Sequence, residues 1–213
     1  IRMKGDRMGY YSYPGQPYQE WTAGYFAMDR WDVSERIRME AQVRGDTYSE
    51  VTTDWSNRFT LFYDADDQDQ HTLRLSVAKA FRVPLTSLRN VESHTVPVGE
   101  FPAGNILYAI HVAPNKKLNN EQTWAFEGGY TGKFSENITL GLNTFYQRVR
   151  DLIGYRSEDH PLAGVIYTPD NIDGGDLYGG EIEAAYKDKQ KSLAVWYAYN
   201  LSLIHISEPT RPY

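Results

Sequence analysis

Residues 35–45 read ERIRMEAQVRG, and their composition favours a helix while their periodicity favours a strand. Arginine, methionine, glutamate, alanine and glutamine all have high helix propensity. Apolar and polar residues nevertheless alternate strictly, which is typical of a strand whose two faces meet different surroundings. The apolar set is Ile37, Met39, Ala41 and Val43, and the polar set is Arg36, Arg38, Glu40, Gln42 and Arg44. We therefore predict a strand with one polar and one apolar face.

The composition excludes several classes of protein. Aromatic residues make up 14% of the 213 residues, which is too many for a disordered chain. A net charge of −6 argues against a nucleic-acid-binding surface, which is normally basic. The chain has no cysteine, so disulfide frameworks and thiolate metal sites are excluded. It begins at Ile1 without an initiator methionine or a signal peptide, and we interpret it as a fragment.

Further period-two patterns predict a series of strands separated by turn signals. The predicted strands are residues 22–31, 35–46, 56–64, 71–81, 121–134, 138–155, 177–187 and 191–200. No run approaches 18 consecutive apolar residues, so a membrane-spanning helix is excluded. A transmembrane strand needs only about ten alternating residues and stays open.

The predicted connections alternate between short and long. Residues 82–119 and 151–176 form the two long loops, and a connection of about nine residues follows the strand 35–46. Strands that run up and down then place all short turns at one end, as in bacterial outer-membrane barrels. We predict an all-β fold, a transmembrane antiparallel up-and-down barrel with about eight to nine strands in this chain. Because an open sheet is not tolerated in hydrocarbon, the barrel must continue in sequence that this chain lacks.

The alternation assigns the two faces of these strands. The residues predicted to face lipid are Ile37, Met39, Val43, Leu73, Leu75, Val77, Trp124 and Phe126. The residues predicted to face a hydrated lumen are Arg36, Arg38, Glu40, Gln42, Arg44, Glu127, Glu181 and Glu183. Aromatic residues near strand ends fit interfacial girdles, although soluble sheets also carry them there.

Three sequence blocks resemble the TonB-dependent receptor family. The central block is LNNEQTWAFEGGYTGKFSENITLGLNTFYQRVRDLIGY, which contains the E-x-G-Y strand of the family and the hairpin that follows it. The blocks LRLSVAKAFRVP and DNIDGGDLYGGEIEAAY are similar to a family strand and a family loop-to-strand motif, in the family's order. The resemblance covers roughly residues 22–200. The family usually has proline before the glutamate that corresponds to Glu121, where this chain has Asn120.

The resemblance implies an active transporter in the outer membrane of Gram-negative bacteria, with a plug inside a barrel of about 22 strands. It implies import of a scarce nutrient (a ferric siderophore, cobalamin or a glycan) driven by the inner-membrane proton gradient. The expected partners are a small-molecule or oligosaccharide ligand at the extracellular loops, the TonB complex through a missing N-terminal part, and lipid or lipopolysaccharide. Neither the plug domain nor a TonB-binding segment is recognised here. The ligand, the oligomeric state and the true C-terminus cannot be read from the sequence.

No motif predicts an enzyme, a cofactor or a metal site. The five histidines form no zinc-ligand spacing, and residues 64–70 lack the glycine of a calcium loop. Ser93 and His94 are adjacent, so their side chains would diverge on a strand, and no nucleophile elbow surrounds them. Because long loops often carry function, we name seven candidates for ligand contact. They are Arg82, Arg89, His94, His111, Arg156, His160 and Tyr167.

The final segment, LSLIHISEPTRPY at residues 201–213, breaks the pattern, although its first residues are compatible with a strand. It resembles the translation of a transposase end and the adaptor used in sequencing libraries. We therefore interpret residues 1–200 as partial barrel and residues 201–213 as adaptor-derived. Two alternatives to an active transporter stay open: a passive barrel such as a porin or an autotransporter pore, and a soluble β-rich binding module.

Overall fold

The computed structural model describes residues 7–12, 20–49, 51–68, 70–97, 110–160 and 164–204, most of which are in β-strands. The chain divides into two compact units. One comprises Ile1–Glu20, Arg82–Glu121 and Asp151–Asp173, and the other comprises Trp21–Phe81, Gln122–Arg150 and Gly174–Tyr213. In the described part of the chain, no helix has the length and apolar character needed to cross a membrane.

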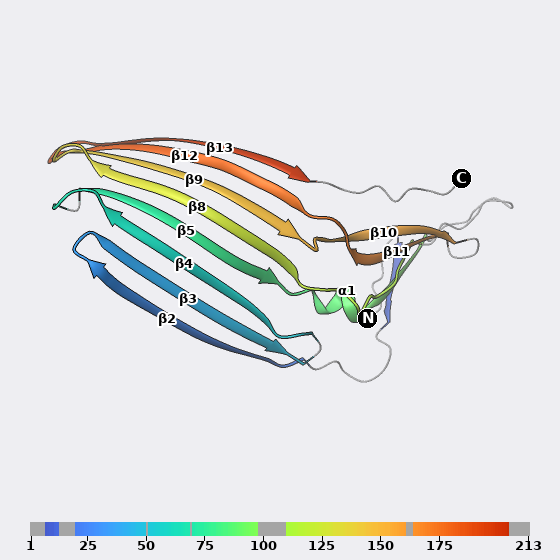
Figure 1. Ribbon diagram of the computed structural model, residues 1–213. Helices are drawn as coiled ribbons and strands as arrows, with labels where there is room; N and C mark the ends of the chain where they lie inside the picture. The colour runs from blue at the N-terminus through green and yellow to red at the C-terminus, as the bar shows by residue number, and fades with distance from the viewer. Residues whose placement is uncertain are drawn as a thin grey trace. The chain divides into compact units, whose positions relative to one another are not determined.

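The second unit is built around an eight-stranded sheet (Figure 1). Its strands, in the order in which they lie side by side, are β13 (Ser192–Ile204), β12 (Gly175–Lys187), β9 (Ile138–Arg150), β8 (Glu121–Lys133), β5 (His71–Arg82), β4 (Asp54–Asp64), β3 (Ile37–Tyr48) and β2 (Thr22–Ser34).

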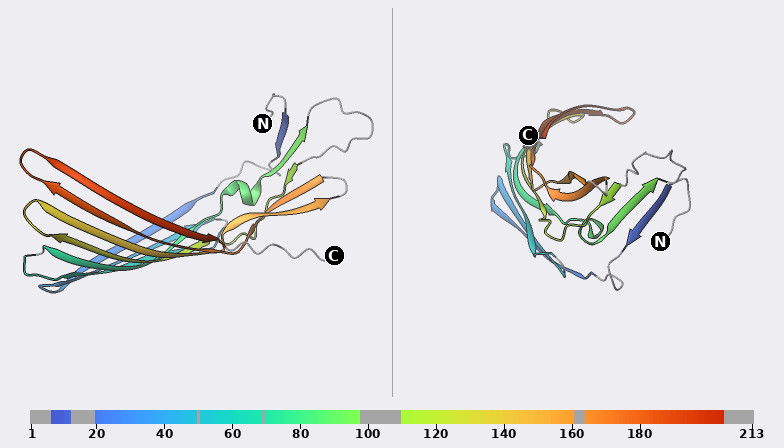
Figure 2. Two further views of the ribbon diagram at one scale, coloured as in Figure 1. Left: turned by 90° about the horizontal axis from the view of Figure 1, so that it is seen from above. Right: turned by 90° about the vertical axis from the view of Figure 1, so that its right-hand side faces the viewer.

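Strands that follow one another within this sheet are also neighbours in it. The hairpins β2–β3, β3–β4, β4–β5, β8–β9 and β12–β13 are antiparallel, as is the pair β9–β12. β5 and β8 run in opposite directions in Figure 1. The sheet is curved, as Figure 2 shows, and it ends at β2 on one side and β13 on the other. The predicted fold, an unclosed antiparallel part of an up-and-down barrel, is confirmed.

Both long connections lie at one end of the sheet, and every connection at the other end is short. The short turns are residues 35–36, 65–70, 134–137 and 188–191. The connections at the other end are residues 49–53, 83–120 and 151–174. The connection between β3 and β4 has five residues instead of the predicted nine, because both strands extend further than their alternation suggested.

The register of the strands gives the sheet two chemically different faces. Residues directly opposite one another in an antiparallel pair share a face. Met39 is opposite Leu61, and Leu61 is opposite Leu75, on what we call the apolar face. Glu40 is opposite Thr60 on the other side, which we call the polar face. The alternation read from residues 35–45 therefore continues coherently from strand to strand.

The first unit contains a five-stranded sheet that the sequence did not predict. Its strands, in spatial order, are β1 (Arg7–Ser12), β6 (Glu92–Pro97), β7 (Ile110–Val112), β11 (Gly164–Asn171) and β10 (Ile153–His160). A short helix, α1 (Thr86–Asn90), precedes β6. β7 and β11 pair in parallel, and the other pairs are antiparallel. The prediction that residues 82–119 and 151–176 are simple loops was wrong.

The prediction of one continuous strand over residues 138–155 was also wrong, because the chain breaks at Asp151. Asp151 has φ 55°, in the left-handed region that an L-residue in a strand does not adopt. Aspartate tolerates this region better than most residues because its short side chain bonds locally. β9 therefore ends at Arg150, and β10 starts in a different sheet at Ile153.

The last strand continues past the predicted limit of residue 200. β13 runs to Ile204, which is opposite Gly175 of β12. Four residues of the segment interpreted as adaptor-derived thus take part in the sheet. Residues 205–213 lie outside the described residues, and the origin of the segment stays a prediction.

Candidate functional site

A network of ion pairs links four strands on the polar face. The Glu127 carboxylate on β8 is 3.4 Å from Arg58 Nη2 on β4 and 3.9 Å from Arg74 Nη1 on β5. Arg74 also donates a hydrogen bond to Asn143 Oδ1 on β9 at 3.3 Å. The Glu127 side chain keeps 21% of its surface exposed, so water screens these pairs. These ion pairs therefore neutralise charge on the polar face but contribute little to the free energy of folding.

Two further pairs extend the same pattern toward β2. Arg30 Nη2 on β2 lies 2.7 Å from Glu40 on β3. Arg38 lies 3.3 Å from the buried Asp64 carboxylate, which also accepts a hydrogen bond from Thr72. In each of these two pairs an acid lies beside a base.

The structure places the residues predicted to face the lumen on one side of the sheet, with one exception. Those on the polar face are Arg38, Glu40, Gln42, Arg44, Glu127, Glu181 and Glu183. Arg36 lies in the turn between β2 and β3, where it forms an ion pair with Asp67. Its predicted place in a strand was wrong, because β3 begins one residue later.

The residues predicted to face lipid lie together on the apolar face. They are Ile37, Met39, Val43, Leu73, Leu75, Val77, Trp124 and Phe126. Leu75 is the most exposed of them, with 61% of its surface accessible, whereas Ile37, Met39 and Val77 are half-buried. β2 follows the alternation less well, because Phe26 and Met28 lie on the polar face and Asp29 lies on the apolar face.

In the first unit, Glu121 joins two of the sequence blocks that resemble the receptor family. Its carboxylate is 5% exposed and forms an ion pair with Arg82, from the block that ends in AFRVP. It also accepts a hydrogen bond from the backbone N–H of Ile153 at 2.7 Å. Hydrogen bonds to a charged acceptor are the stronger kind. Glu121 therefore fixes the start of β10.

Asn171 performs a similar role for the third block. Its Oδ1 accepts a hydrogen bond from the N–H of Asn119 at 2.8 Å, and its Nδ2 donates to the Asn119 carbonyl at 3.1 Å. Nδ2 also donates to the Asp151 carbonyl at 2.7 Å. The Asn171 amide thus pairs with the backbone of Asn119 as a neighbouring strand would. Its bond to the Asp151 carbonyl also stabilises the left-handed conformation of Asp151. The motif letters are explained by this junction, which is structural and not catalytic.

A third tie holds α1 to the segment before β2. Arg89 is 2% exposed, and its Nη2 is 2.7 Å from the Glu20 carboxylate. The Thr86 hydroxyl donates to the other carboxylate oxygen at 2.6 Å. The Thr86 hydrogen bond, with help from Arg89, holds the pKa of Glu20 below its ordinary value of 4.5, although burial works in the opposite direction.

This tie predicts a pH dependence of the first unit. Because the folded-state pKa of Glu20 is lowered, the tie stabilises the fold fully above the unfolded value of 4.5 and is lost as pH falls through the folded value. We expect the protection factors of the α1 amides, corrected for the pH dependence of intrinsic exchange, to fall below about pH 4.5 in the full-length protein. Thr86→Val should move the midpoint upward, toward 4.5. An identical midpoint in both proteins would contradict the assignment.

Two of the predicted ligand contacts are engaged inside the first unit. Arg89 is buried by its pair with Glu20, so its charge is not available at the surface. Arg82 pairs with Glu121 and stays largely exposed, which leaves part of its guanidinium accessible. Because Arg89 is buried in this ion pair, its guanidinium is not available to contact a ligand.

Three other candidates lie on adjoining strands of the five-stranded sheet. Arg156 on β10 is exposed and lies 2.6 Å from the Asp170 carboxylate. His111 Nε2 on β7 lies 2.8 Å from Glu92. Tyr167 on β11 is opposite Ser157 in the register of β10. The register places Arg156 and His111 on one face of this sheet and Tyr167 on the other.

His94 lies on β6, opposite His111 in the backbone register, and His160 ends β10. Their side chains lie outside the described residues. Among the described residues, no three histidines or acids are grouped closely enough to hold a metal ion.

The model of the family described as TonB dependent receptor-like, beta-barrel, matches residues 4–209. The chain belongs to this family. The match includes the three sequence blocks whose residues meet around Glu121 and Asn171. No curated protein sequence matches the chain.

Solved structures show the same fold. The siderophore receptor PirA from Pseudomonas aeruginosa is 16% identical, with a TM-score of 0.70 over 86% of this chain and 35% of that one. PirA from Acinetobacter baumannii is 18% identical, with a TM-score of 0.67 over 85% and 28%. The ferric enterobactin receptor PfeA from Pseudomonas aeruginosa, in complex with enterobactin, is 18% identical, with a TM-score of 0.68 over 84% of this chain and 27% of that one. The chain spans about a third or less of each of these TonB-dependent receptors.

The sequence reading missed the acidic partners of the basic loop residues. Glu20, Glu92 and Asp170 each pair with a candidate, but each is distant from it along the chain or belongs to an unpredicted strand. Glu121 and Asn171 stood inside the quoted motifs, so a signal existed. What the motifs did not show was which residues they meet.

Proposed function

We propose that this chain is part of the barrel of a TonB-dependent transporter in the outer membrane of a Gram-negative bacterium. The observation that carries the proposal is the two-faced sheet, whose apolar residues are exposed on one side while acids and bases pair on the other. In water the exposed apolar face would be unfavourable. In a barrel it faces hydrocarbon, and the polar face lines the lumen.

The short turns then lie on the periplasmic side and the long connections on the extracellular side, as in bacterial barrels. Residues 1–200 form part of the barrel and its extracellular loops, and residues 201–213 are adaptor-derived. The plug and the segment that contacts the TonB complex lie outside this chain. Sequencing the genomic DNA across codons 195–213 tests the origin of the tail. If the tail is adaptor-derived, the genomic sequence will encode a different segment, the native strand, in place of SEPTRPY.

A ferric siderophore is the ligand that we favour over cobalamin or a glycan. Three of the similar structures are of siderophore or ferric enterobactin receptors. The exposed guanidinium of Arg156 suits an anionic iron chelate, and His111 lies on the same face of the five-stranded sheet, whereas Tyr167 lies on the opposite face. Energy comes from the inner-membrane proton gradient through the TonB complex.

Uptake of radioactive iron tests this function. A deletion strain complemented with the full-length gene is given iron-55 as ferric enterobactin, with cyanocobalamin and a maltooligosaccharide as alternative probes. We expect accumulation of one probe, and loss of that accumulation when the tonB gene is deleted or the proton gradient is collapsed. Accumulation that persists without TonB would instead support a passive pore. Recovery of the full-length protein in the soluble fraction would support a soluble binding module.

A further inference from the structure

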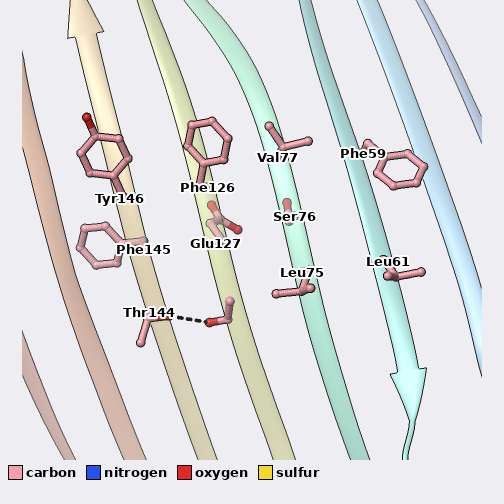
Figure 3. A pocket seen from close by; sticks show the side chains of 11 residues that line it. Phe59, Leu61, Leu75, Ser76, Val77, Phe126, Glu127, Thr144, Phe145 and Tyr146 are labelled. Atoms are coloured by element: carbon pink, nitrogen blue, oxygen red, sulfur yellow. Dashed lines mark hydrogen bonds between the residues drawn. The ribbon is translucent and has the colours of Figure 1, made fainter.

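The strand β2 places an acid on the apolar face of the eight-stranded sheet. Asp29 is exposed there, opposite Ala41 of β3, and Ala41 is opposite Phe59 of β4. Phe59 lies in turn opposite Val77 of β5, and Figure 3 shows these two side chains on neighbouring strands. A carboxylate therefore stands at the end of a row of apolar side chains.

This row lies midway between two levels of aromatic residues. On β4, Tyr63 and Trp55 are each four residues from Phe59, in opposite directions along the strand. Trp55 packs edge-on against Tyr25 of β2, with ring centroids 5.2 Å apart. Four residues of a strand span about 13 Å, and the apolar band of a membrane barrel is about 25 Å tall between its aromatic girdles. The row of Asp29 is therefore central in the apolar band.

Among the described residues, no base forms an ion pair with Asp29. Its Oδ1 accepts the backbone N–H of Arg30 at 2.9 Å, but the Arg30 guanidinium lies on the polar face, 2.7 Å from Glu40. Lys79 lies on the apolar face of β5, three strands from β2, which is about 14 Å at the usual strand spacing. Its Nζ is 3.4 Å from Asp54. An ionised carboxylate in hydrocarbon needs a partner, so the partner must come from elsewhere.

The free edge of β2 is the place from which a partner can reach Asp29. β2 is the last strand of the sheet, and no described strand pairs with its far edge (Figure 1). In hydrocarbon the backbone groups of that edge must be bonded to another strand. A residue of that strand directly opposite Asp29 would share its face, with the two Cβ atoms about 4.5–5.5 Å apart.

We propose that the strand preceding β2 in the full-length protein carries a lysine or an arginine opposite Asp29, and that the two residues form an ion pair on the outer wall of the barrel. The inference rests on the proposed function, which places the apolar face in hydrocarbon and supplies the preceding strand from outside this chain. Charge complementarity selects the partner, because an unpaired carboxylate is unfavourable at this depth.

The ion pair fixes the register of β2 against that strand. An alternating hydrophobic pattern normally specifies register, but β2 has Phe26 and Met28 on its polar face and the small Ala23 and Ala27 on its apolar face. A slip by two residues keeps every side chain on its face and changes little apolar packing. The same slip separates the two charges and leaves both unpaired in hydrocarbon, which is strongly unfavourable.

The first test measures this register in the full-length receptor in outer membranes. Ala27→Cys is combined in turn with single cysteine substitutions along the preceding strand, whose sequence is read from the genomic DNA, and disulfide formation is scored. The position that crosslinks to residue 27 identifies the residue opposite Asp29, two positions along. We expect a lysine or an arginine there, and any other residue overturns the proposal.

The second test asks whether the two charges are coupled. Replacing only the base with methionine leaves Asp29 unpaired and should lower the folded-to-unfolded ratio in a urea series about a hundredfold or more. Adding Asp29→Ala should restore most of that ratio, and the crosslinks from Ala27→Cys should then spread to positions two residues apart. Failure of the double variant to recover would overturn the proposal.

Asp32→Ala is the matched control, because it removes an acid from the polar face of the same strand, where Asp32 is opposite Arg38. It should keep the single crosslink and a folded-to-unfolded ratio within about threefold of the wild type. An inserted receptor with an uncharged residue opposite Asp29 would refute this inference alone. Recovery of the receptor in the soluble fraction would refute the proposed function.

Discussion

Replacing Leu75 with arginine is expected to impair insertion of the full-length barrel by about 2–4 kcal/mol, the cost of an arginine on the lipid face near the bilayer midplane. Leu75 is exposed and central in β5, and its neighbours across the strands are Leu61 and Gly128. The measurement is the folded fraction in lipid vesicles, followed by heat-modifiable migration in gels across a urea series.

Gln147→Arg is the matched control, because it adds the same side chain to the polar face. Gln147 is opposite Ala125 and Leu177, so the new guanidinium meets no existing base across the strands. We expect a change within about 0.5 kcal/mol, as for an ordinary hydrated substitution. Equal losses in the two variants would show that the faces do not differ in environment, and the barrel orientation would be wrong.

Replacing Glu121 with alanine is expected to lower the opening free energy of the junction by about 2–3 kcal/mol. The change leaves the buried N–H of Ile153 without its acceptor and removes the partner of Arg82. Exposure of Arg82 moderates the loss, since water replaces part of the ion pair. Hydrogen exchange at the start of β10 in the full-length receptor should accelerate about 30- to 150-fold.

Glu136→Ala serves as the control for this change, because Glu136 is an exposed residue of the turn between β8 and β9. It should leave exchange at Ile153 unaltered. Glu121→Gln should show an intermediate effect, since an amide oxygen still accepts the backbone hydrogen bond but carries no charge. If Glu121→Ala exchanged like the wild type, the junction would not depend on this carboxylate.

The eight-stranded sheet was predictable because each of its strands repeats one signal. Met39, Leu61 and Leu75 alternate with polar residues on three successive strands, and the turns between them are short. Local periodicity and hairpin connection together suffice to order such a sheet. Strand ends were less accurate, because the last residues of β3 and the first residues of β4 pair beyond the point where their alternation is visible.

The five-stranded sheet was not predictable by the same means. β6 and β11 contain prolines and polar runs, and β7 is only three residues long. Its strands come from segments that are distant in the sequence, so their pairing depends on tertiary structure and not on a local pattern. The same reason explains Arg89, whose positive charge suggested a ligand contact until Glu20 was found beside it.

The order of assembly follows from the parallel pairing of β7 with β11. The whole β8–β9 hairpin separates these two strands along the chain, so their contact closes a long loop at a considerable entropic cost. Hairpins of adjacent strands close short loops and are favoured early. We infer that the five-stranded sheet forms last, after the neighbouring hairpins of the eight-stranded sheet have paired, so the slowest folding step should be the protection of its backbone amides.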